Sequence, residues 1–257
     1  MIAITPLVSV VTVTYNAANC IERCIASVND QSYANIEHVF IDGSSTDSTI
    51  EIIKKASSRI YFLVSEPDNG IYDAMNKALR FCKGEIICFL NSDDQYFSSE
   101  SMREVVDSMI KYKAGFAFGE AIYSTSLGII KRRTESSFID YFKLPVSQIA
   151  HPCLFVTKDI IQKYSLHYPR QYTIAADLYY QSLLFRNRVP FVYISKTLVN
   201  IQLGGVSTVS MESYLRGWKQ ALSIYLRVYN FKGVFFFLGK LLFKIPFLGP
   251  FPSVQKK

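Results

Sequence analysis

Cysteine is scarce in this sequence, and no arrangement of cysteines indicates a site. Five cysteines occur among 257 residues, with no CxxC pair and no spacing typical of a disulfide framework. This argues against a zinc site or a thioredoxin-like motif and favours a reducing compartment. The opening residues, MIAITPLVSVV, lack the basic and long apolar regions of a signal peptide, and no uncharged apolar run reaches 18 residues. We therefore expect a cytoplasmic protein without a membrane-spanning helix.

The glycine-rich loops that hold nucleotide phosphates are also missing. The segment VTVTYNAANC, residues 11–20, has no glycine, so it lacks the dinucleotide-binding fingerprint. A Gly-Lys pair occurs in GVFFFLGKLL, residues 233–242, but its spacing and the leucine after it do not fit a P-loop. Both absences disfavour a nicotinamide-dependent oxidoreductase and a P-loop nucleotidase.

The composition of the chain is that of a folded protein with a basic surface. Hydrophobic residues make up 49% and charged residues 19%, which predicts a sizeable core. The length suits one large domain, or one domain with an appendage. The net charge is +7. Such a charge suits a nucleotide, a nucleic acid or an anionic membrane surface, or it serves solubility alone. Nucleic acid has only the charge in its favour, because no basic helix or known motif accompanies it.

Strand-like and helix-like segments alternate through the first half of the chain. Apolar and β-branched runs that end in turn-forming residues read as strands, and runs with apolar residues three or four apart read as helices. The expected strands are 7–16, 36–45, 59–67 and 85–91, and the expected helices are 18–28, 45–57, 71–84 and 99–112. This order predicts an α/β protein with a Rossmann-like, mostly parallel sheet between two layers of helices.

The second half of the chain has a less regular pattern. We expect strands at 114–124, 128–133 and 189–203, a strand leading into a helix at 150–161, and helices at 175–185 and 211–228. We place one domain at residues 1–210 and a C-terminal helical extension at residues 211–257.

Three polar clusters follow the ends of predicted parallel strands. They are Thr14-Tyr15-Asn16, Asp42-Gly43-Ser44 and Ser92-Asp93-Asp94. Because ligands of open α/β sheets bind beyond the carboxyl ends of the strands, we expect the three clusters to form one site. Adjacent carboxylates such as Asp93 and Asp94 resist burial. They form either a solvated turn or a site for a divalent cation, which shares its ligands with substrate phosphates.

Two longer stretches carry a family resemblance. The stretch VSVVTVTYNAANCIERCIASVNDQSYANIEHVFIDGSSTDSTIEII and the later EPDNGIYDAMNKALRFCKGEIICFLNSDDQYF resemble the family 2 glycosyltransferases, which have the GT-A fold. The resemblance is strong over residues 7–102 and weaker to about residue 207. It implies a sugar-nucleotide site at the carboxyl ends of the strands. The GIYDAMNKA form resembles that of bacterial enzymes that build polysaccharides.

The resemblance assigns roles to the first two clusters. Thr14, Tyr15 and Asn16 match the first segment of the family that contacts the nucleotide. Asp42 matches an acid that contacts the nucleoside, usually through the base. An ionised carboxylate accepts hydrogen bonds only, which suits a ring N–H donor.

The third cluster matches the metal motif of the family, usually written DxD. Here Ser92 replaces the first aspartate, so the chain departs from that form. The resemblance makes Asp94 the ligand of a Mg²⁺ or Mn²⁺ ion and Asp93 a contact to the sugar or ribose, with the division of roles between them left open.

A further polar group lies in the helix after residue 70. Asn69, Asp73 and Asn76 share one helical face and are predicted to contact sugar hydroxyls or lie near the diphosphate. Many relatives have Ala-Arg-Asn in this helix, where this chain has Ala-Met-Asn and so lacks a cationic contact. The alternative is a capping cluster at the helix start with an exposed Asp73.

The resemblance also indicates a general base and a residue beside the acceptor. Asp177 matches the carboxylate that takes the proton of the acceptor hydroxyl; otherwise it is an acid that stabilises a helix N-terminus. Asp140 and Asp159 are weaker candidates because neither has the motif around it. His151 either borders the acceptor or has a structural role. Residues 204–208, GGVST, resemble a loop that closes over the diphosphate, or they form an ordinary turn.

The C-terminal sequence is aromatic and basic. RVYNFKGVFFFLGKLLFKIPFLGPFP predicts an amphipathic helix that lies on a membrane surface, since its consecutive phenylalanines cannot all face one core. The alternative is a helix packed on the catalytic domain or on a second subunit.

The sequence therefore predicts an inverting GT-A glycosyltransferase. It would move a sugar from a nucleotide donor, a UDP-sugar, to a hydroxyl of a glycan or lipid-linked acceptor at the inner face of the membrane. The alternatives are a sugar nucleotidyltransferase, which would need a glycine-rich basic loop after the first strand, and a non-catalytic nucleotide-sugar-binding module.

Overall fold

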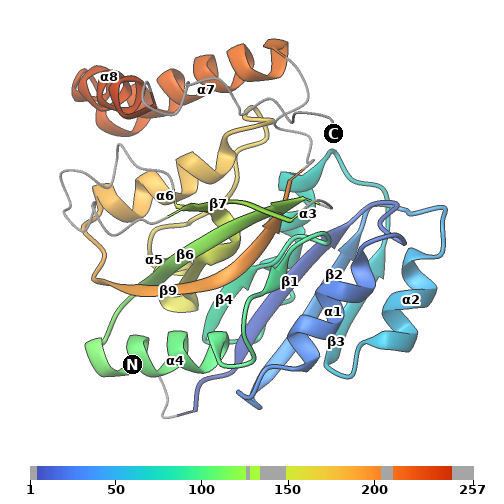
Figure 1. Ribbon diagram of the computed structural model, residues 1–257. Coiled ribbons are helices and arrows are strands. Elements are labelled where there is room, and N and C mark those ends of the chain that lie inside the picture. Colours follow the sequence, from blue (N-terminus) through green and yellow to red (C-terminus); the bar gives the residue numbers. More distant parts are fainter. Residues whose placement is uncertain (1–4, 126–127, 134–148, 204–210, 245–257) are drawn as a thin grey trace.

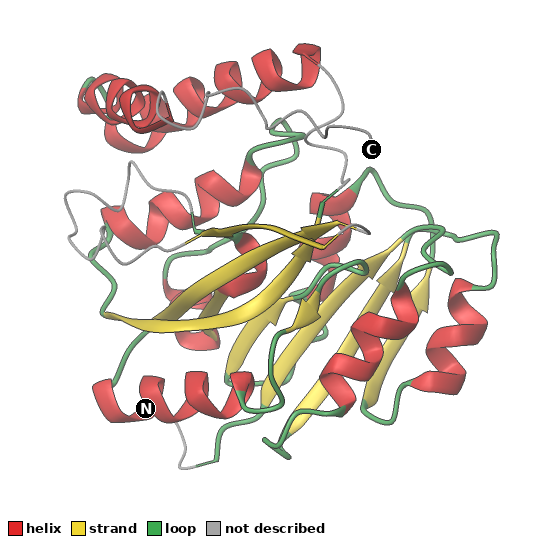
Figure 2. Ribbon diagram, viewed as in Figure 1, coloured by secondary structure: helices red, strands yellow, loops and turns green. Residues whose placement is uncertain are grey.

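A curved nine-stranded sheet with helices on both faces forms the centre of the protein (Figure 1). The computed structural model describes residues 5–125, 128–133, 149–203 and 211–244, which are the coloured parts of the chain in Figure 2. The strand count refers to these residues. Within them the strands lie in the order β3-β2-β1-β4-β8-β6-β9-β5, and β7 pairs with β6 outside this path.

The first four strands form a parallel half-sheet, as the sequence predicts. Strand β1 pairs in parallel with β2 and β4, and β2 pairs in parallel with β3. Every residue of β1 and β2 is buried, which explains their continuous apolar runs. The elements are β1 Val8–Thr14, α1 Ile21–Asn29, β2 Ile36–Asp42, α2 Thr49–Ala56, β3 Ile60–Ser65, α3 Ile71–Ala78 and β4 Ile86–Phe89.

The second half of the sheet is mixed rather than parallel. Strand β8 pairs antiparallel with both β4 and β6, whereas β9 runs parallel to β6. The segment that begins at His151 opens with a 3-10 turn, η2 His151–Cys153, before β8. The other elements are β5 Gln95–Tyr96, α4 Ser101–Tyr112, β6 Phe116–Thr125, β7 Gly128–Arg133, β8 Leu154–Thr157, α5 Lys158–Lys163, α6 Ala176–Arg186 and β9 Phe191–Gln202.

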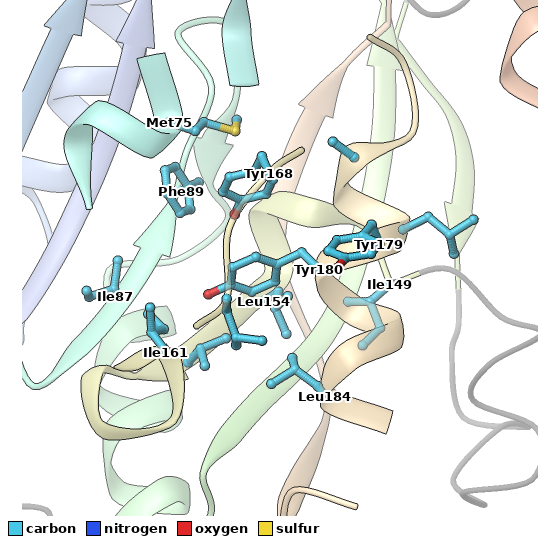
Figure 3. Close-up of a cluster of buried hydrophobic side chains, with 14 of the residues drawn as sticks. Met75, Ile87, Phe89, Ile149, Leu154, Ile161, Tyr168, Tyr179, Tyr180 and Leu184 are labelled. Carbon is cyan, nitrogen blue, oxygen red and sulfur yellow. The ribbon is translucent and has the colours of Figure 1, made fainter. Parts of the chain in front are cut away.

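Alternating side chains of the strands feed two separate cores. In β1, Val8 and Val10 belong to the core shared with α1, α2 and α4, whereas Val11 and Val13 belong to the core shared with α3, α5 and α6. The second core is unusually aromatic. In Figure 3, Tyr168 lies between Phe89 and Tyr180, with ring centroids 5.6 and 4.8 Å away. This core joins the parallel half of the sheet to α6.

Two C-terminal helices cover α6 on its outer side (Figure 1). They are α7 Met211–Tyr229 and α8 Lys232–Lys244. The buried residues of α7, Ala221, Ile224, Tyr225 and Val228, belong to the same core as α6. Gly233 lies against the Tyr225 backbone where a Cβ atom would collide, so the turn into α8 requires glycine. None of the described helices combines the length and the apolarity that crossing a membrane requires.

Candidate functional site

The loops that follow β1 and β2 are joined at one edge of the sheet, where the first two predicted clusters meet. Thr14 lies opposite Asp42 in the parallel register, and its hydroxyl donates a 2.9 Å hydrogen bond to Asp42 Oδ1. Asn16 has a left-handed backbone with φ of 47°. Its amide N–H donates to Ser45 Oγ and its side-chain oxygen accepts from Thr46 N–H, at 2.8 and 2.9 Å. The two loops therefore form one connected platform.

Asp42 is the centre of this platform rather than an open ligand contact. It is fully buried, and its four hydrogen bonds come from Thr14, from Ser65 and twice from Ser45. Burial by itself raises the pKa of the Asp42 carboxyl, but the hydrogen bonds outweigh it and hold the pKa below its usual value. All four lone-pair positions are in use, so in this arrangement Asp42 shapes the loops. Its contact with a nucleoside stays a prediction.

The exposed surface of the platform is formed by Tyr15 and the residues around Gly43. Tyr15 is 65% exposed. A Cβ atom on Gly43 would approach Asp68 Oδ2 to 2.7 Å and Tyr15 Cδ2 to 3.5 Å, so glycine lets the two loops and Asp68 meet. Asp68 also accepts a 2.8 Å hydrogen bond from Gly70 N–H at the start of α3. This arrangement leaves a flat aromatic surface and a carboxylate at the sheet edge.

The third cluster contains a deeply buried carboxylate. Asp94 is 1% exposed; it accepts hydrogen bonds from Asn91 Nδ2 at 2.8 Å and from Gln202 N–H at 3.1 Å. Burial and then the neighbouring Asp93 raise the pKa of Asp94 to about 7. Burial also raises the pKa of Asp93, against the opposing effect of Arg23. Asp94 is therefore buried, whereas Ser92 and Asp93 are half-buried, and the role of the cluster as a metal site stays a prediction.

These carboxylates fit a divalent cation that takes most of its ligands from elsewhere. None of the ion pairs among the described residues includes Asp93 or Asp94. The described part of the chain also holds no group of three His, Cys, Asp or Glu side chains that would bind a metal unaided. Mg²⁺ and Mn²⁺ prefer oxygen ligands, and Mg²⁺ is often held by one or two carboxylates together with substrate phosphates. The donor set of Asp93 and Asp94 suits that kind of site.

The polar group at the start of α3 mainly holds the protein together. Asp73 is 4% exposed, not exposed as in the capping alternative, and accepts a 3.1 Å hydrogen bond from Asn69 N–H. It also pairs with Arg170 Nη2 at 2.7 Å. The Asn69 backbone bond, and to a lesser extent Arg170, hold the pKa of Asp73 below its usual value although burial opposes them. Sequence reasoning missed Arg170, which has no motif around it.

Asn76 is occupied by the backbone of a distant segment. Its side-chain nitrogen donates to Tyr168 O at 2.7 Å, and its side-chain oxygen accepts from Tyr168 N–H at 2.9 Å. The amide therefore has a structural partner at both ends. The arrangement gives no support to the predicted sugar contacts of Asp73 and Asn76, which stay untested predictions; Asn69 is exposed and remains accessible.

His151, Tyr168 and Asp177 come together below α3. His151 Nε2 lies 2.8 Å from the Tyr168 hydroxyl, and its Nδ1 is buried without a hydrogen-bond partner among the described residues. Burial lowers the pKa of His151, and the nearby Asp177 carboxylate acts in the opposite direction. Asp177 lies in the first turn of α6 and also raises the pKa of Tyr72, after burial. The Asp177 carboxylate is thus close enough to influence both His151 and Tyr72, and the acceptor-site roles of His151 and Asp177 stay predictions.

Three other predicted features remain. Asp140 and the GGVST loop lie beyond the described residues, and Asp159 lies in the first turn of α5. Besides Arg170, sequence reasoning missed Ser45, Ser65, Tyr72, Tyr168 and Gln202. Only the two serines could have been predicted, because a buried carboxylate such as Asp42 accepts hydrogen bonds from nearby hydroxyl groups.

Comparison with known proteins identifies the family. Residues 9–168, more than half of the chain, match the sequence profile of "Glycosyl transferase family 2". The chain belongs to this family. An Escherichia coli relative, "UDP-Glc:alpha-D-GlcNAc-diphosphoundecaprenol beta-1,3-glucosyltransferase WfgD", is 32% identical over 60% of each chain. The chain spans 40% to 60% of the length of three curated relatives that it matches, and 11% of the length of two others.

Solved structures confirm the GT-A fold of this family 2 protein. Staphylococcus aureus TarS (residues 1–349) in complex with UDP-GlcNAc matches 94% of this chain and 73% of its own, with a TM-score of 0.75 and 16% identity. The Pyrobaculum calidifontis mannosyltransferase PcManGT in complex with GDP-Man and Mn²⁺ matches 96% of this chain and 77% of its own, with a TM-score of 0.65 and 18% identity. The predicted fold class is confirmed.

Proposed function

We propose that this protein is an inverting, metal-dependent glycosyltransferase of polysaccharide biosynthesis. It transfers a sugar from a UDP-sugar to a hydroxyl of a glycan or lipid-linked acceptor. The observation that carries the proposal is the adjacent pair of buried Asp94 and half-buried Asp93 at the sheet edge, neither with an ion-pair partner among the described residues. Such a pair is costly for the fold and is explained by a cation and a diphosphate that arrive together.

The choice of UDP rests on the relatives. WfgD is named for a UDP-glucose donor and a diphosphoundecaprenol acceptor, and TarS has been solved with UDP-GlcNAc. We extend a UDP-sugar donor and a lipid-diphosphate-linked acceptor to this chain. On the platform, Tyr15 provides an exposed aromatic face beside Asp68, onto which a nucleobase can stack.

Asp94 would hold the metal, which supplies positive charge to the leaving diphosphate when it is bound, and Asp93 would contact the sugar or ribose. The hydrogen bonds from Asn91 and Gln202 fix the Asp94 carboxylate from two sides. Because Gln202 ends β9 and Asn91 follows β4, Asp94 also joins two distant strands. Because β4 runs parallel to β1 and β2, Asp94 lies at the same edge of the sheet as the β1 and β2 loops. We place the diphosphate between Asp94 and the platform that these loops form.

The chemistry requires a base on the acceptor side, and we assign this role to Asp177. The acceptor oxygen forms a bond to the anomeric carbon while the bond from that carbon to the diphosphate oxygen breaks. The acceptor hydroxyl proton goes to the Asp177 carboxylate, and UDP leaves with the bonding electron pair. His151, bonded to Tyr168 and beside Asp177, borders the acceptor. Attack on the face opposite the leaving group inverts the anomeric centre.

The test is UDP release from UDP-glucose and UDP-GlcNAc in the presence of a GlcNAc-diphospholipid acceptor. We expect Asp177→Asn to reduce turnover by about a hundredfold or more while leaving UDP affinity unchanged. Asp159→Asn is the matched control, since that aspartate also lies in the first turn of a helix. Full turnover in Asp177→Asn would refute the assignment of the base. Nucleotide binding without turnover in the unaltered protein would support a binding module instead.

We also propose that α8 holds the enzyme at the inner face of the membrane. Phe231, the residue before α8, and Val234, Phe235 and Leu238 on α8 are 73%, 40%, 69% and 49% exposed. The spacing of these four residues (i, i+3, i+4 and i+7) is that of side chains on one side of a helix. The opposite side packs inward, with the Phe236 ring 4.7 Å from that of Tyr229. The phenylalanines are thus divided between the protein interior and the exposed side of α8. Exposed cations on α7 (Arg216, Lys219 and Arg227) and on α8 (Lys232) favour binding to anionic lipid.

Cosedimentation with vesicles tests this surface. We expect the full chain to bind vesicles of phosphatidylglycerol and phosphatidylcholine more strongly than vesicles of phosphatidylcholine alone. The double variant Phe231→Ser/Phe235→Ser should lose most of the binding, because each exposed aromatic contributes apolar area at the interface. Tyr112→Ser on α4, at an equally exposed aromatic, is the control. Unchanged binding by the double variant would contradict the proposal, as would its loss in the control.

A further inference from the structure

The C-terminal helix α7 reaches the segment that leads into the predicted base. Gln220 Oε1 accepts hydrogen bonds from the backbone N–H groups of Ile174 and Ala175, at 3.0 and 3.1 Å. Its Nε2 donates to Thr173 Oγ1 at 3.1 Å. All three partners lie two to four residues before Asp177. One side chain of the C-terminal extension therefore holds the entry to α6.

This contact binds backbone N–H groups just before α6, where the neighbouring sequence provides no side-chain acceptor. Helix α6 begins at Ala176, and the preceding Ala175 has no side chain that can accept a hydrogen bond. The first N–H groups of a helix and of the turn before it need partners from outside the helix. Gln220 satisfies two of these groups although it lies 45 residues away in the chain. The helix start is thus fixed by tertiary contact rather than by its own sequence.

The same peptide is held from the opposite side by α3. The Tyr72 hydroxyl donates a 2.9 Å hydrogen bond to Ile174 O. Burial and the Asp177 carboxylate raise the pKa of Tyr72, so the phenol keeps its proton and remains a donor. Residue 174 therefore has its N–H bound to α7 and its carbonyl bound to α3. With both groups of Ile174 held, the start of α6 has little freedom to shift relative to α3.

We propose that Gln220 is a positioning residue for catalysis, which places the Asp177 carboxylate by fixing the backbone at residues 173–175. The inference rests on the proposed role of Asp177 as the base. It also makes α7 part of the catalytic unit, although the sequence placed the end of the catalytic domain before this helix. A shift of about 1 Å in a catalytic group can reduce turnover by about a hundredfold.

The test compares Gln220→Leu and Gln220→Glu with a matched control in the UDP-release assay. Leucine keeps the side-chain volume but removes the acceptor oxygen and the donor nitrogen, whereas glutamate keeps an oxygen that accepts from Ile174 and Ala175. Ser223→Ala is the control, because it removes a 3.3 Å contact between α7 and Tyr172 without touching residues 173–175. Amide hydrogen exchange at Ile174 and Ala175 reports directly whether the contact has been lost.

We expect Gln220→Leu to lower kcat by about tenfold or more with the donor KM within twofold, and to accelerate exchange at the two amides. Gln220→Glu should restore the slow exchange and most of kcat. It should also move the acid limb of the pH profile to higher pH, because the added negative charge near Asp177 opposes ionisation of that carboxyl. Ser223→Ala should keep kcat within twofold.

Several results would overturn the inference. One is unchanged kcat in Gln220→Leu with fast exchange at Ile174 and Ala175. Another is an equal loss of kcat in Gln220→Leu, Gln220→Glu and Ser223→Ala, which indicates a general loss of packing. If Gln220→Leu does not fold, Gln220→Glu decides, since failure to keep kcat at high pH contradicts the proposal. Full activity in Asp177→Asn refutes the base itself, whereas an inactive Asp177→Asn with fully active Gln220 variants refutes only the positioning role.

Discussion

At the scale of residues, two buried carboxylates at one sheet edge have pKa values shifted in opposite directions. Asp42 has four donors from protein groups, and its pKa lies below the usual value. Asp94 has two donors and a like charge beside it, and its pKa rises to about 7. Protein donors stabilise the ionised form of Asp42. The ionised form of Asp94 is not stabilised in this way, and a bound cation would stabilise it.

The low pKa of Asp42 makes it a source of stability at neutral pH. A carboxyl with a lowered folded-state pKa stabilises the protein above its usual value of 3.8, and this contribution is lost as the pH falls through the lower folded-state pKa. We expect Asp42→Asn to lower the free energy of unfolding by about 2 kcal/mol at pH 7 and by less near pH 3. Urea denaturation at both pH values measures this. Asp107→Asn, an exposed aspartate on α4, is the control, and an equal loss at both pH values would contradict the account.

Asp94 should have the reverse effect on stability. Its folded-state pKa is raised, so its contribution is most favourable below pH 3.8 and becomes a cost as the pH rises through about 7. We expect Asp94→Asn to raise the free energy of unfolding by up to about 4 kcal/mol at pH 8, with little change at pH 4.

Denaturation with and without Mn²⁺ extends that measurement. Manganese should raise the free energy of unfolding of the unaltered protein but not that of Asp94→Asn. The difference in the free energy of unfolding between the two proteins at pH 8 should therefore become smaller. A variant less stable than the original at pH 8 would show that Asp94 has a structural role instead.

At the scale of elements, helix α3 connects the Asp68 segment beside the β1 and β2 loops to the distant segment that contains Tyr168 and Arg170. Its first turn holds Arg170 through Asp73, and its middle holds the Tyr168 backbone through Asn76. The sequence predicted this helix and the polar face that carries Asp73 and Asn76. It could not predict their partners, because Tyr168 and Arg170 lie more than 90 residues away and no local pattern marks them.

The clamp between α3 and Tyr168 should contribute to stability rather than to nucleotide binding. Asn76→Ala removes two hydrogen bonds and leaves the Tyr168 N–H and carbonyl groups without these partners. We expect a loss of about 2 to 3 kcal/mol in the free energy of unfolding, with UDP affinity changed by less than twofold. Chemical denaturation and calorimetric titration measure the two quantities. A large loss of UDP affinity at unchanged stability would instead support the predicted contact of Asn76 with the donor.

At the scale of the whole molecule, the parallel half could be predicted and the mixed half could not. Strands β1 to β4 are continuous apolar runs separated by helices, a pattern with few possible topologies. The later strands are paired by long-range contacts; β8 inserts between β4 and β6, and β9 lies between β6 and β5. The same limit applied to the C-terminal residues, whose composition indicated a membrane surface but not that α7 packs into the catalytic core.

The central claim is that Asp94 binds a metal together with a uridine diphosphate at the edge of this sheet. Calorimetric titration with UDP, GDP and dTDP, each with and without Mn²⁺, on the unaltered protein and on Asp94→Ala tests it most directly. The account predicts that UDP binds with Mn²⁺, binds much more weakly without the metal, and loses the metal-dependent part in the variant. Metal-independent binding of equal strength in both proteins, or no nucleotide binding at all, would contradict it.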